Sequence, residues 1–417
     1  MTESTVGSTE RERLTTVIVH EHDALAALVA NRIVAVIHEA TEARGRCVLG
    51  LATGSTPLGI YRELIRRFDA GDVDFDRVVT FNLDEYYPMP SDSVQSYHRY
   101  MWENFFEHVN IRAEHVHLPD GNVPRDQVRA HAQAYEGLIR EAGGIDYQIL
   151  GIGKTGHIGF NEPGSSPRSR TRLVTLDAIT RKDAAQDFFG EDNVPREAVT
   201  MGIATILEAR EIALVATGEH KAAIVRRTVE GDPSPEVAAT FLQGHPNTTV
   251  YLDDAAAADL TRVATPWVLD AIEWTPEMME RAVVWLCEQV GKAVLKLNGH
   301  DYQEHGLTAL LTAYGSPGAV NGEVFNRLKD KIRGRSKLPS GQRVLVFSPH
   351  PDDDVISMGG MLRKLWENEN AVVVAYMTSG NIAVFDEDVR RYLDFADRSA
   401  DTLGLDRDRV VRERQAA

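Results

Sequence analysis

The chain has 417 residues, of which 43% are hydrophobic and 26% charged, and its formal net charge is −17. The length predicts two or three domains of ordinary globular composition. The negative charge argues against general binding to nucleic-acid phosphates, so we expect no nucleic-acid partner. Two cysteines, Cys47 and Cys287, exclude a disulfide framework and favour the reducing cytoplasm. No apolar run approaches a membrane span, so we expect no membrane partner.

Strands and helices alternate between residues 13 and 265, after a polar segment at 1–12 that is typical of a disordered leader. Apolar runs predict strands at 16–19, 47–51, 77–82, 146–149, 170–176, 212–217 and 249–252. Helical periodicity predicts helices at 23–43, 57–68, 96–109, 125–142, 221–230 and 254–261. This order indicates an α/β fold, Rossmann-like, with a mainly parallel sheet between helices. The aromatic residues of 96–109, including Tyr97, have the spacing of core residues.

The remaining third of the chain differs in composition. Residues 266–340 begin with a helix opened by Thr275 and Pro276, and they then become polar, with a basic run at 329–337 that is typical of a solvated segment. We interpret 266–340 as a helical linker. Residues 341–417 predict a strand at 343–347, a helix at 355–367 and a strand at 371–377, which is an incomplete second α/β domain.

A glycine-rich loop at residues 150–163 follows the strand at 146–149 and carries His157 and Glu162. Glycine lets a substrate approach the backbone closely. A histidine whose tautomer is fixed by a nearby carboxylate can transfer protons near neutral pH. The structural alternative is a tight turn whose histidine only bonds its neighbours, and the loop by itself gives both readings similar weight.

Residues Gly54, Ser55 and Thr56 connect the strand at 47–51 to a helix, with Thr56 as its expected N-cap and Pro57 in its first turn. The free N–H groups and positive dipole end of such a helix favour an anion. Lys221, in the first turn of a later helix, opposes the helix dipole unless an anion lies before it. A well-capped helix and a solvated lysine are the structural alternatives.

Asp84 and Glu85 follow the strand at 77–82, at the sheet edge where open α/β sheets bind ligands. One carboxylate could act as a base while the other supports the loop. The alternative is a pair of solvated turn residues.

His350 and Asp353 stand three residues apart after the strand at 343–347, a spacing at which both can ligate Zn²⁺ while Asp352 activates water. A catalytic zinc site needs a third protein ligand, and His350 is the last of the 14 histidines. We therefore expect an incomplete zinc site.

Taken together, the motifs resemble two families. The first is the glucosamine-6-phosphate deaminase (glucosamine/galactosamine-6-phosphate isomerase) family, and its motifs match residues 53–57, 79–86, 156–163, 169–172 and 242–246 in order. The second comprises zinc-dependent de-N-acetylases acting on N-acetylglucosaminyl groups, whose opening motif is similar to residues 350–353.

The first resemblance implies a hydrolase and isomerase of amino-sugar metabolism that converts glucosamine 6-phosphate and water to fructose 6-phosphate and ammonia. It implies that Asp84 moves a proton between C2 and C1, and that His157, tuned by Glu162, opens the sugar ring. Residues Gly54, Ser55, Thr56, Glu85 and Lys221 would bind the substrate and its phosphate. No cofactor is implied, Zn²⁺ belongs only to a complete de-N-acetylase domain, and a homo-oligomer is compatible with the family.

The sequence departs from this family at two positions. Thr155 stands where the family usually has an aspartate two residues before the histidine. The family also usually carries a phosphate-binding arginine just before a Phe-Phe pair, but residues 184–187, before Phe188 and Phe189, contain none. A hydroxyl can bond an imidazole but cannot stabilise its cation as a carboxylate does. The alternative is therefore a weakened sugar-phosphate-binding module that serves an attached de-N-acetylase. Lactone hydrolysis is a third reading, which residues 160–163 disfavour.

Overall fold

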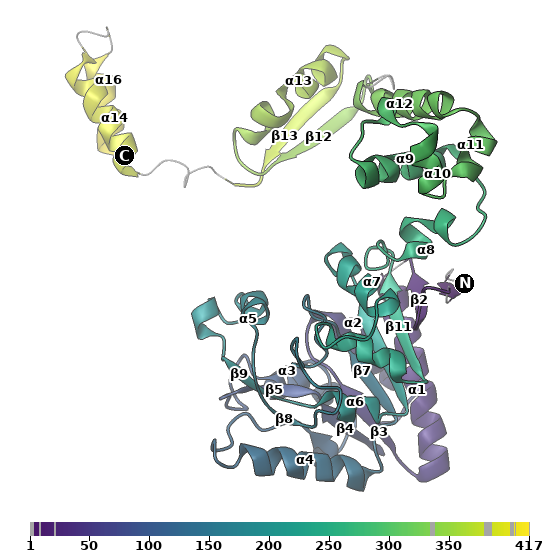
Figure 1. The fold of residues 1–417 in the computed structure, drawn as a ribbon. Helices are drawn as coiled ribbons and strands as arrows, with labels where there is room; N and C mark the ends of the chain where they lie inside the picture. Colours follow the sequence, from purple (N-terminus) through teal and green to yellow (C-terminus); the bar gives the residue numbers. More distant parts are fainter. Residues whose placement is uncertain are drawn as a thin grey trace. The chain divides into compact units, whose positions relative to one another are not determined.

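A computed structural model of the protein describes residues 4–7, 10–20, 22–333, 338–378, 386–400, 404 and 406–416. The chain divides into two compact units, Met1–Glu273 and Trp274–Ala417 (Figure 1). We describe each unit by itself.

The first unit is built on an eight-stranded sheet of order β1-β2-β11-β10-β7-β3-β4-β6. All pairs are parallel except β1–β2. The strands are β1 Ser4–Gly7, β2 Thr15–Val19, β3 Cys47–Leu51, β4 Val78–Asn82, β6 Val116–His117, β7 Tyr147–Leu150, β10 Glu211–Ala216 and β11 Thr248–Asp253. Every residue of β3, β4 and β7 is buried, which explains why these strands read as unbroken apolar runs. The predicted mainly parallel α/β fold is confirmed.

Helices cover this sheet. They are α1 His22–Arg44, α2 Ser55–Asp69, α3 Tyr97–Asn104, α4 Val128–Ala142, α6 Ile203–Leu207, α7 Ala222–Glu230 and α8 Thr261–Ala264. By length and composition, α1 could cross a membrane, which the sequence expectation had not allowed for. Val29, Ala30 and Ile33 of α1 are nevertheless fully buried, and α1 packs on β3 and β11. Its apolar character is therefore that of a core helix.

A second, antiparallel sheet of order β5-β9-β8 lies in the same unit. It consists of β5 Asp84–Tyr87, β8 Arg172–Thr175 and β9 Glu197–Thr200, and α5 Ala178–Ala184 lies between β8 and β9 in the chain. The strand predicted at 170–176 exists, but it belongs to this small sheet. The sequence analysis missed β9 and α5, because both are short and carry no clear periodicity.

Three local expectations were wrong. Residues 1–12 are not wholly a disordered leader: β1 pairs with β2, and the buried Glu12 accepts a hydrogen bond from Thr16 and pairs with Arg262. The predicted helix at 254–261 is a series of turns, and α8 begins only at Thr261. Helix α2 begins at Ser55 with Gly54 as its N-cap, so Thr56 lies inside the first turn.

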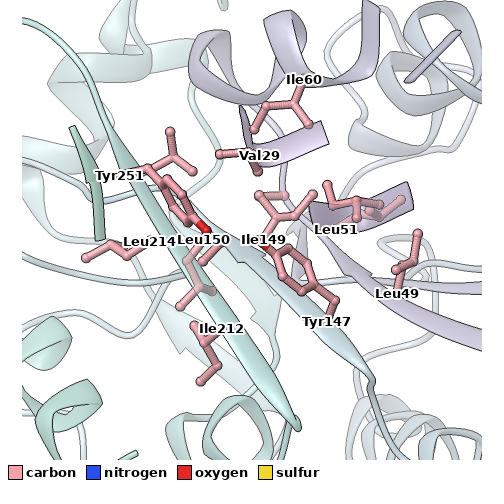
Figure 2. Packing of buried hydrophobic residues seen from close by; sticks show 14 of the residues in the cluster. Val29, Leu49, Leu51, Ile60, Tyr147, Ile149, Leu150, Ile212, Leu214 and Tyr251 are labelled. Carbon is pink, nitrogen blue, oxygen red and sulfur yellow. The ribbon is translucent and has the colours of Figure 1, made fainter. Parts of the chain in front are cut away.

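The main core lies between the sheet and these helices. Figure 2 shows how side chains from α1, α2 and the central strands interdigitate there. Ile149 of β7 is 2% exposed and lies beside Leu51 and Tyr147. Strand β7 thus joins the two halves of the sheet through a closely packed centre.

The second unit begins with helices and continues with a two-stranded parallel sheet. Its elements are α9 Pro276–Val290, α10 Gly299–Glu304, α11 Thr308–Tyr314, α12 Pro317–Arg333, β12 Arg343–Ser348, α13 Asp353–Glu367, β13 Ala371–Tyr376, α14 Asp386–Arg398 and α16 Arg407–Ala416. Thr275 caps α9 as predicted. Residues 329–333 of the basic run belong to α12, where the Lys331 side chain is 64% exposed, and 334–337 lie outside the described residues.

We predict that Ile149→Ala lowers the free energy of unfolding of the first unit by roughly 2–5 kcal/mol, because it leaves a cavity in a packed centre. Urea denaturation followed by circular dichroism measures this loss. Val94→Ala, at a side chain that is 69% exposed, is the matched control and should change stability by less than about 0.5 kcal/mol. Equal losses in the two variants would contradict the description of the core.

Candidate active site

A cavity of about 280 Å³ opens at the carboxyl ends of β10, β7, β3 and β4, four neighbouring strands of the main sheet. The chain order reverses direction between β3 and β7, and ligands of open α/β sheets bind at such a switch point. The loops that follow these strands supply the walls. The lining residues are Ala52, Thr53, Gly54, Ser55, Thr56, Pro57, Leu83, Asp84, Tyr97, Gly151, Ile152, Gly153, His157, Gly159, Phe160, Thr217, His220 and Lys221.

The glycines of the loop after β7 allow close contacts that any side chain would block. A Cβ atom on Gly153 would lie 2.1 Å from Nε2 of His157, so the imidazole rests directly on the glycine backbone. Gly159 has φ of 54°, and its Cβ would lie 2.9 Å from Oγ1 of Thr200 and 3.3 Å from Oδ2 of Asp84. The glycine-rich loop therefore fits closely around the histidine and the carboxylate.

His157 and Glu162 form a hydrogen-bonded pair, with 3.1 Å between Nδ1 and Oε2. Oγ1 of Thr155 lies 3.0 Å from the same nitrogen, and Oγ1 of Thr180 lies 3.4 Å from it. Burial would raise the pKa of Glu162, but its hydrogen bonds to His157, Thr180 and the Asp177 N–H outweigh burial and lower this pKa. Glu162 is therefore a carboxylate that holds Nδ1 protonated and leaves Nε2 at the cavity wall able to exchange a proton.

Asp84 begins β5 opposite Thr200 of β9, and its side chain reaches the cavity. Burial, and secondly the charge of Glu85, raise the pKa of Asp84 to about 8. A carboxyl group with its pKa near neutrality is suited to take up and return a proton.

Glu85 points away from the cavity and anchors α3. Its carboxylate accepts hydrogen bonds from the backbone N–H groups of Tyr86, Tyr97 and His98 at 2.9–3.1 Å. Burial raises its pKa to about 7 despite these bonds. Of the two roles considered for the acidic pair, Glu85 takes that of support, and its position does not agree with the predicted binding of substrate.

Four of the predicted phosphate-binding residues, Gly54, Ser55, Thr56 and Lys221, line the cavity. Gly54, Ser55 and Thr56 form the start of α2, where no side chain caps the helix and no acidic residue lies in the first turn. Lys221 is the N-cap residue of α7. Its ammonium group donates a hydrogen bond to the carbonyl oxygen of Ile152, at 2.7 Å. Burial lowers the pKa of Lys221. The free N–H groups at the start of α2 and the ammonium group of Lys221 can therefore receive an anion in this cavity.

Tyr97 and Thr180 are among the residues of the site that were not predicted. Tyr97, read from the sequence as a core aromatic, lines the cavity and stacks on Phe160, with 6.2 Å between the ring centroids. Thr180 comes from α5, which the sequence did not reveal. Neither residue belongs to a pattern that distinguishes a cavity wall from ordinary packing.

The predicted metal-binding residues of the second unit lie at the start of α13. Nδ1 of His350 is 2.8 Å from Oδ2 of Asp353, and Asp352 is exposed at the helix N-cap. Within the described residues, no cluster of three or more His, Cys, Asp or Glu side chains could hold a metal. Two donors do not fit a catalytic zinc site, which takes three protein ligands.

We predict that Asp84→Asn removes a pH-dependent loss of stability. The pKa of Asp84 is about 8 in the folded protein and near 3.8 in an unfolded chain, so the folded state binds more protons between these values and the wild type loses stability as the pH rises. Thermal unfolding from pH 5 to 8 should therefore show Asp84→Asn gaining steadily relative to wild type. A stability difference that does not change with pH would contradict the raised pKa.

Comparisons with known proteins identify both parts of the chain. Residues 20–251 match the family of glucosamine-6-phosphate isomerases/6-phosphogluconolactonase, and residues 345–411 match GlcNAc-PI de-N-acetylase. The chain is 40% identical, over 98% of its length, to a glucosamine-6-phosphate deaminase-like protein of Bacteroides thetaiotaomicron, of which it spans 64%.

Three shorter relatives match the first unit. Glucosamine-6-phosphate deaminases of Halothermothrix orenii and Rhodopirellula baltica are 51% and 49% identical over 51% and 59% of this chain, covering 87% and 96% of those proteins. A solved structure of a monomeric glucosamine-6-phosphate deaminase is 41% identical over 58% of this chain and 99% of its own, with a TM-score of 0.56. The chain belongs to the family of glucosamine-6-phosphate isomerases and 6-phosphogluconolactonases.

Proposed function

We propose that the first unit is a glucosamine-6-phosphate deaminase that releases ammonia and forms fructose 6-phosphate in cytoplasmic amino-sugar metabolism. The observation that carries this proposal is that Asp84 and His157 line one cavity together with the predicted phosphate-binding residues, while Glu162 is hydrogen-bonded to His157. The deaminase names of the relatives that match nearly their whole length support it.

The proposed reaction assigns a separate task to each group. His157 exchanges a proton at Nε2 to open the sugar ring, while Glu162 stabilises the imidazolium that forms. Asp84 removes the proton from C2 and delivers it to C1, which gives a 2-imino sugar. Water then hydrolyses the imine to the ketone and ammonia. No metal or organic cofactor takes part in these steps.

Binding of the substrate's phosphate group would supply binding energy from a part of the substrate that is remote from the reacting carbons. The first turn of α2 and Lys221 would hold the phosphate, so that C1 and C2 lie at Asp84. Tyr97 and Phe160 would pack against the sugar from the side. The oligomeric state and any partner chain are outside this proposal.

We predict that Asp84→Asn lowers kcat by roughly 10²–10⁴-fold while the Kd for glucosamine 6-phosphate changes little, because general acid–base groups contribute about this much. An assay coupled to fructose 6-phosphate measures kcat, and calorimetry measures Kd. Asp92→Asn, an exposed loop residue, is the control. Wild-type protein that binds the sugar phosphate without turnover would overturn the proposed function.

A second candidate function rests on Thr155. If the hydroxyl leaves His157 poorly activated, the unit would be a weakened sugar-phosphate-binding module attached to a de-N-acetylase. The short contacts from His157 to both Thr155 and Glu162 favour the active enzyme, because Glu162 already supplies a carboxylate. In this account Thr155 positions the imidazole and does not replace a missing charge.

Thr155→Asp separates the two candidates. The active-enzyme proposal predicts a small change in kcat, since a second carboxylate at Nδ1 adds little to the first. A weakened module predicts that kcat rises by about tenfold or more, as restoring an acid–base partner does. Thr155→Val, which removes only the hydroxyl, serves as the matched control.

For the second unit we propose no reaction. The chain spans 64% of the Bacteroides relative, and the match to the de-N-acetylase family covers residues 345–411. Because the described donors do not complete a zinc site, we derive no step through that metal.

A further inference from the structure

Lys221 is the one Lys or Arg residue among the described residues that line the active-site cavity. A sugar phosphate carries close to two negative charges at neutral pH. One ammonium group therefore leaves part of that charge to the first turn of α2 and to solvent. A second cation near Lys221 would neutralise the remaining negative charge of the phosphate group.

Lys154 is the nearest candidate along the catalytic loop. It follows Gly153, which lines the cavity, and stands two residues after Ile152, whose carbonyl oxygen accepts the hydrogen bond from Lys221. The flexible four-carbon stem of a lysine can place its charge several ångströms from its backbone. The ammonium group of Lys221 thus contacts the backbone of the catalytic loop two residues before Lys154.

Lys154 is paired with Asp183 of α5, with 2.6 Å between Nζ and Oδ1. Both side chains are substantially exposed, at 51% and 36%. Such a pair contributes little stability, and its charges can be rearranged at small cost. Asp183 and Lys154 also both act on Lys221, since the first raises its pKa and the second lowers it. The three charges therefore form one electrostatic cluster beside the catalytic loop.

Helix α5 also touches the catalytic pair. Thr180 lies 3.4 Å from Nδ1 of His157, and the N–H of Asp177 donates to Glu162 at 3.2 Å. These contacts hold α5, and with it Asp183, beside the catalytic loop. There the carboxylate of Asp183 forms its ion pair with the ammonium group of Lys154. A phosphate entering the cavity would compete with that carboxylate for the same cation.

We propose that Lys154 is a second phosphate-binding cation, which exchanges the carboxylate of Asp183 for the phosphate group of the substrate. This inference rests on the proposed function, because it takes the substrate to be a sugar phosphate. It makes Asp183 a competitor of the phosphate, so the two members of the ion pair have opposite effects on binding.

The test is calorimetric titration of glucosamine 6-phosphate into Asp84→Asn protein, in which no turnover disturbs the measurement, and of inorganic phosphate into otherwise wild-type protein. Adding Lys154→Met should weaken both Kd values by about tenfold, as expected for loss of one charge-assisted hydrogen bond. Asp183→Asn should leave both Kd values unchanged or make them tighter. Lys182→Met, an exposed lysine of α5, is the matched control and should have no effect.

The outcomes separate a binding role from a structural one. If the ion pair only fixes α5, Lys154→Met and Asp183→Asn weaken binding equally, and the inference is wrong. It is also wrong if Lys154→Met matches Lys182→Met. Circular dichroism of each variant checks that the fold is retained.

Failure of the proposed function looks different. Glucosamine 6-phosphate that binds wild-type protein without turnover overturns the deaminase proposal but leaves the Lys154 comparison intact. Binding of neither probe to any form of the protein overturns both.

Discussion

Burial of the Asp84 carboxyl group is the constraint on which the rest of the site depends. Its side chain lies where β4 passes into β5, and burial and the charge of Glu85 hold its pKa at about 8. Burial makes the ionised form of this carboxyl group energetically unfavourable, whereas a fully exposed carboxylate would be a weak base. The surrounding structure keeps it between these limits: Gly159 approaches without a side chain, and Thr200 faces it across the small sheet.

The two sheets position different residues of the site. The parallel sheet brings the loops after β3 and β7 together at its switch point, which places the start of α2 near the catalytic loop. The small antiparallel sheet carries Asp84 and continues into α5, which contacts His157 and Glu162. Glu85 of the small sheet fixes the start of α3, and α3 presents Tyr97 to the cavity.

The sequence predicted the parts of the site that carry chemical signatures. Asp84, His157 and Glu162 stand in motifs whose residue types and glycines limit what they can do, and the structure brings all three together. The role of Glu85 could not be predicted, since adjacent residues of a strand point to opposite faces and the choice of face depends on pairing with β9. That pairing is non-local, and β9 itself has only four residues.

Other parts of the structure could not be predicted for related reasons. The N-cap of α2 was placed two residues late, because proline at the third helical position and at the first look alike in sequence. Thr180 reaches the site through α5, whose seven residues give too little periodicity to mark a helix. When a short segment contacts a loop that is distant in the sequence, the contact leaves no local pattern of residues that would predict it.

The most direct test of the central claim follows the hydrogen atoms at C1 of fructose 6-phosphate by proton NMR in D₂O, with ammonium present to drive the reverse reaction. If Asp84 is the base, wild-type protein should exchange one of the two C1 hydrogens and leave the other, because a single carboxyl group faces one side of the carbon. Asp84→Asn should exchange neither. Exchange at the wild-type rate in Asp84→Asn protein would contradict the account.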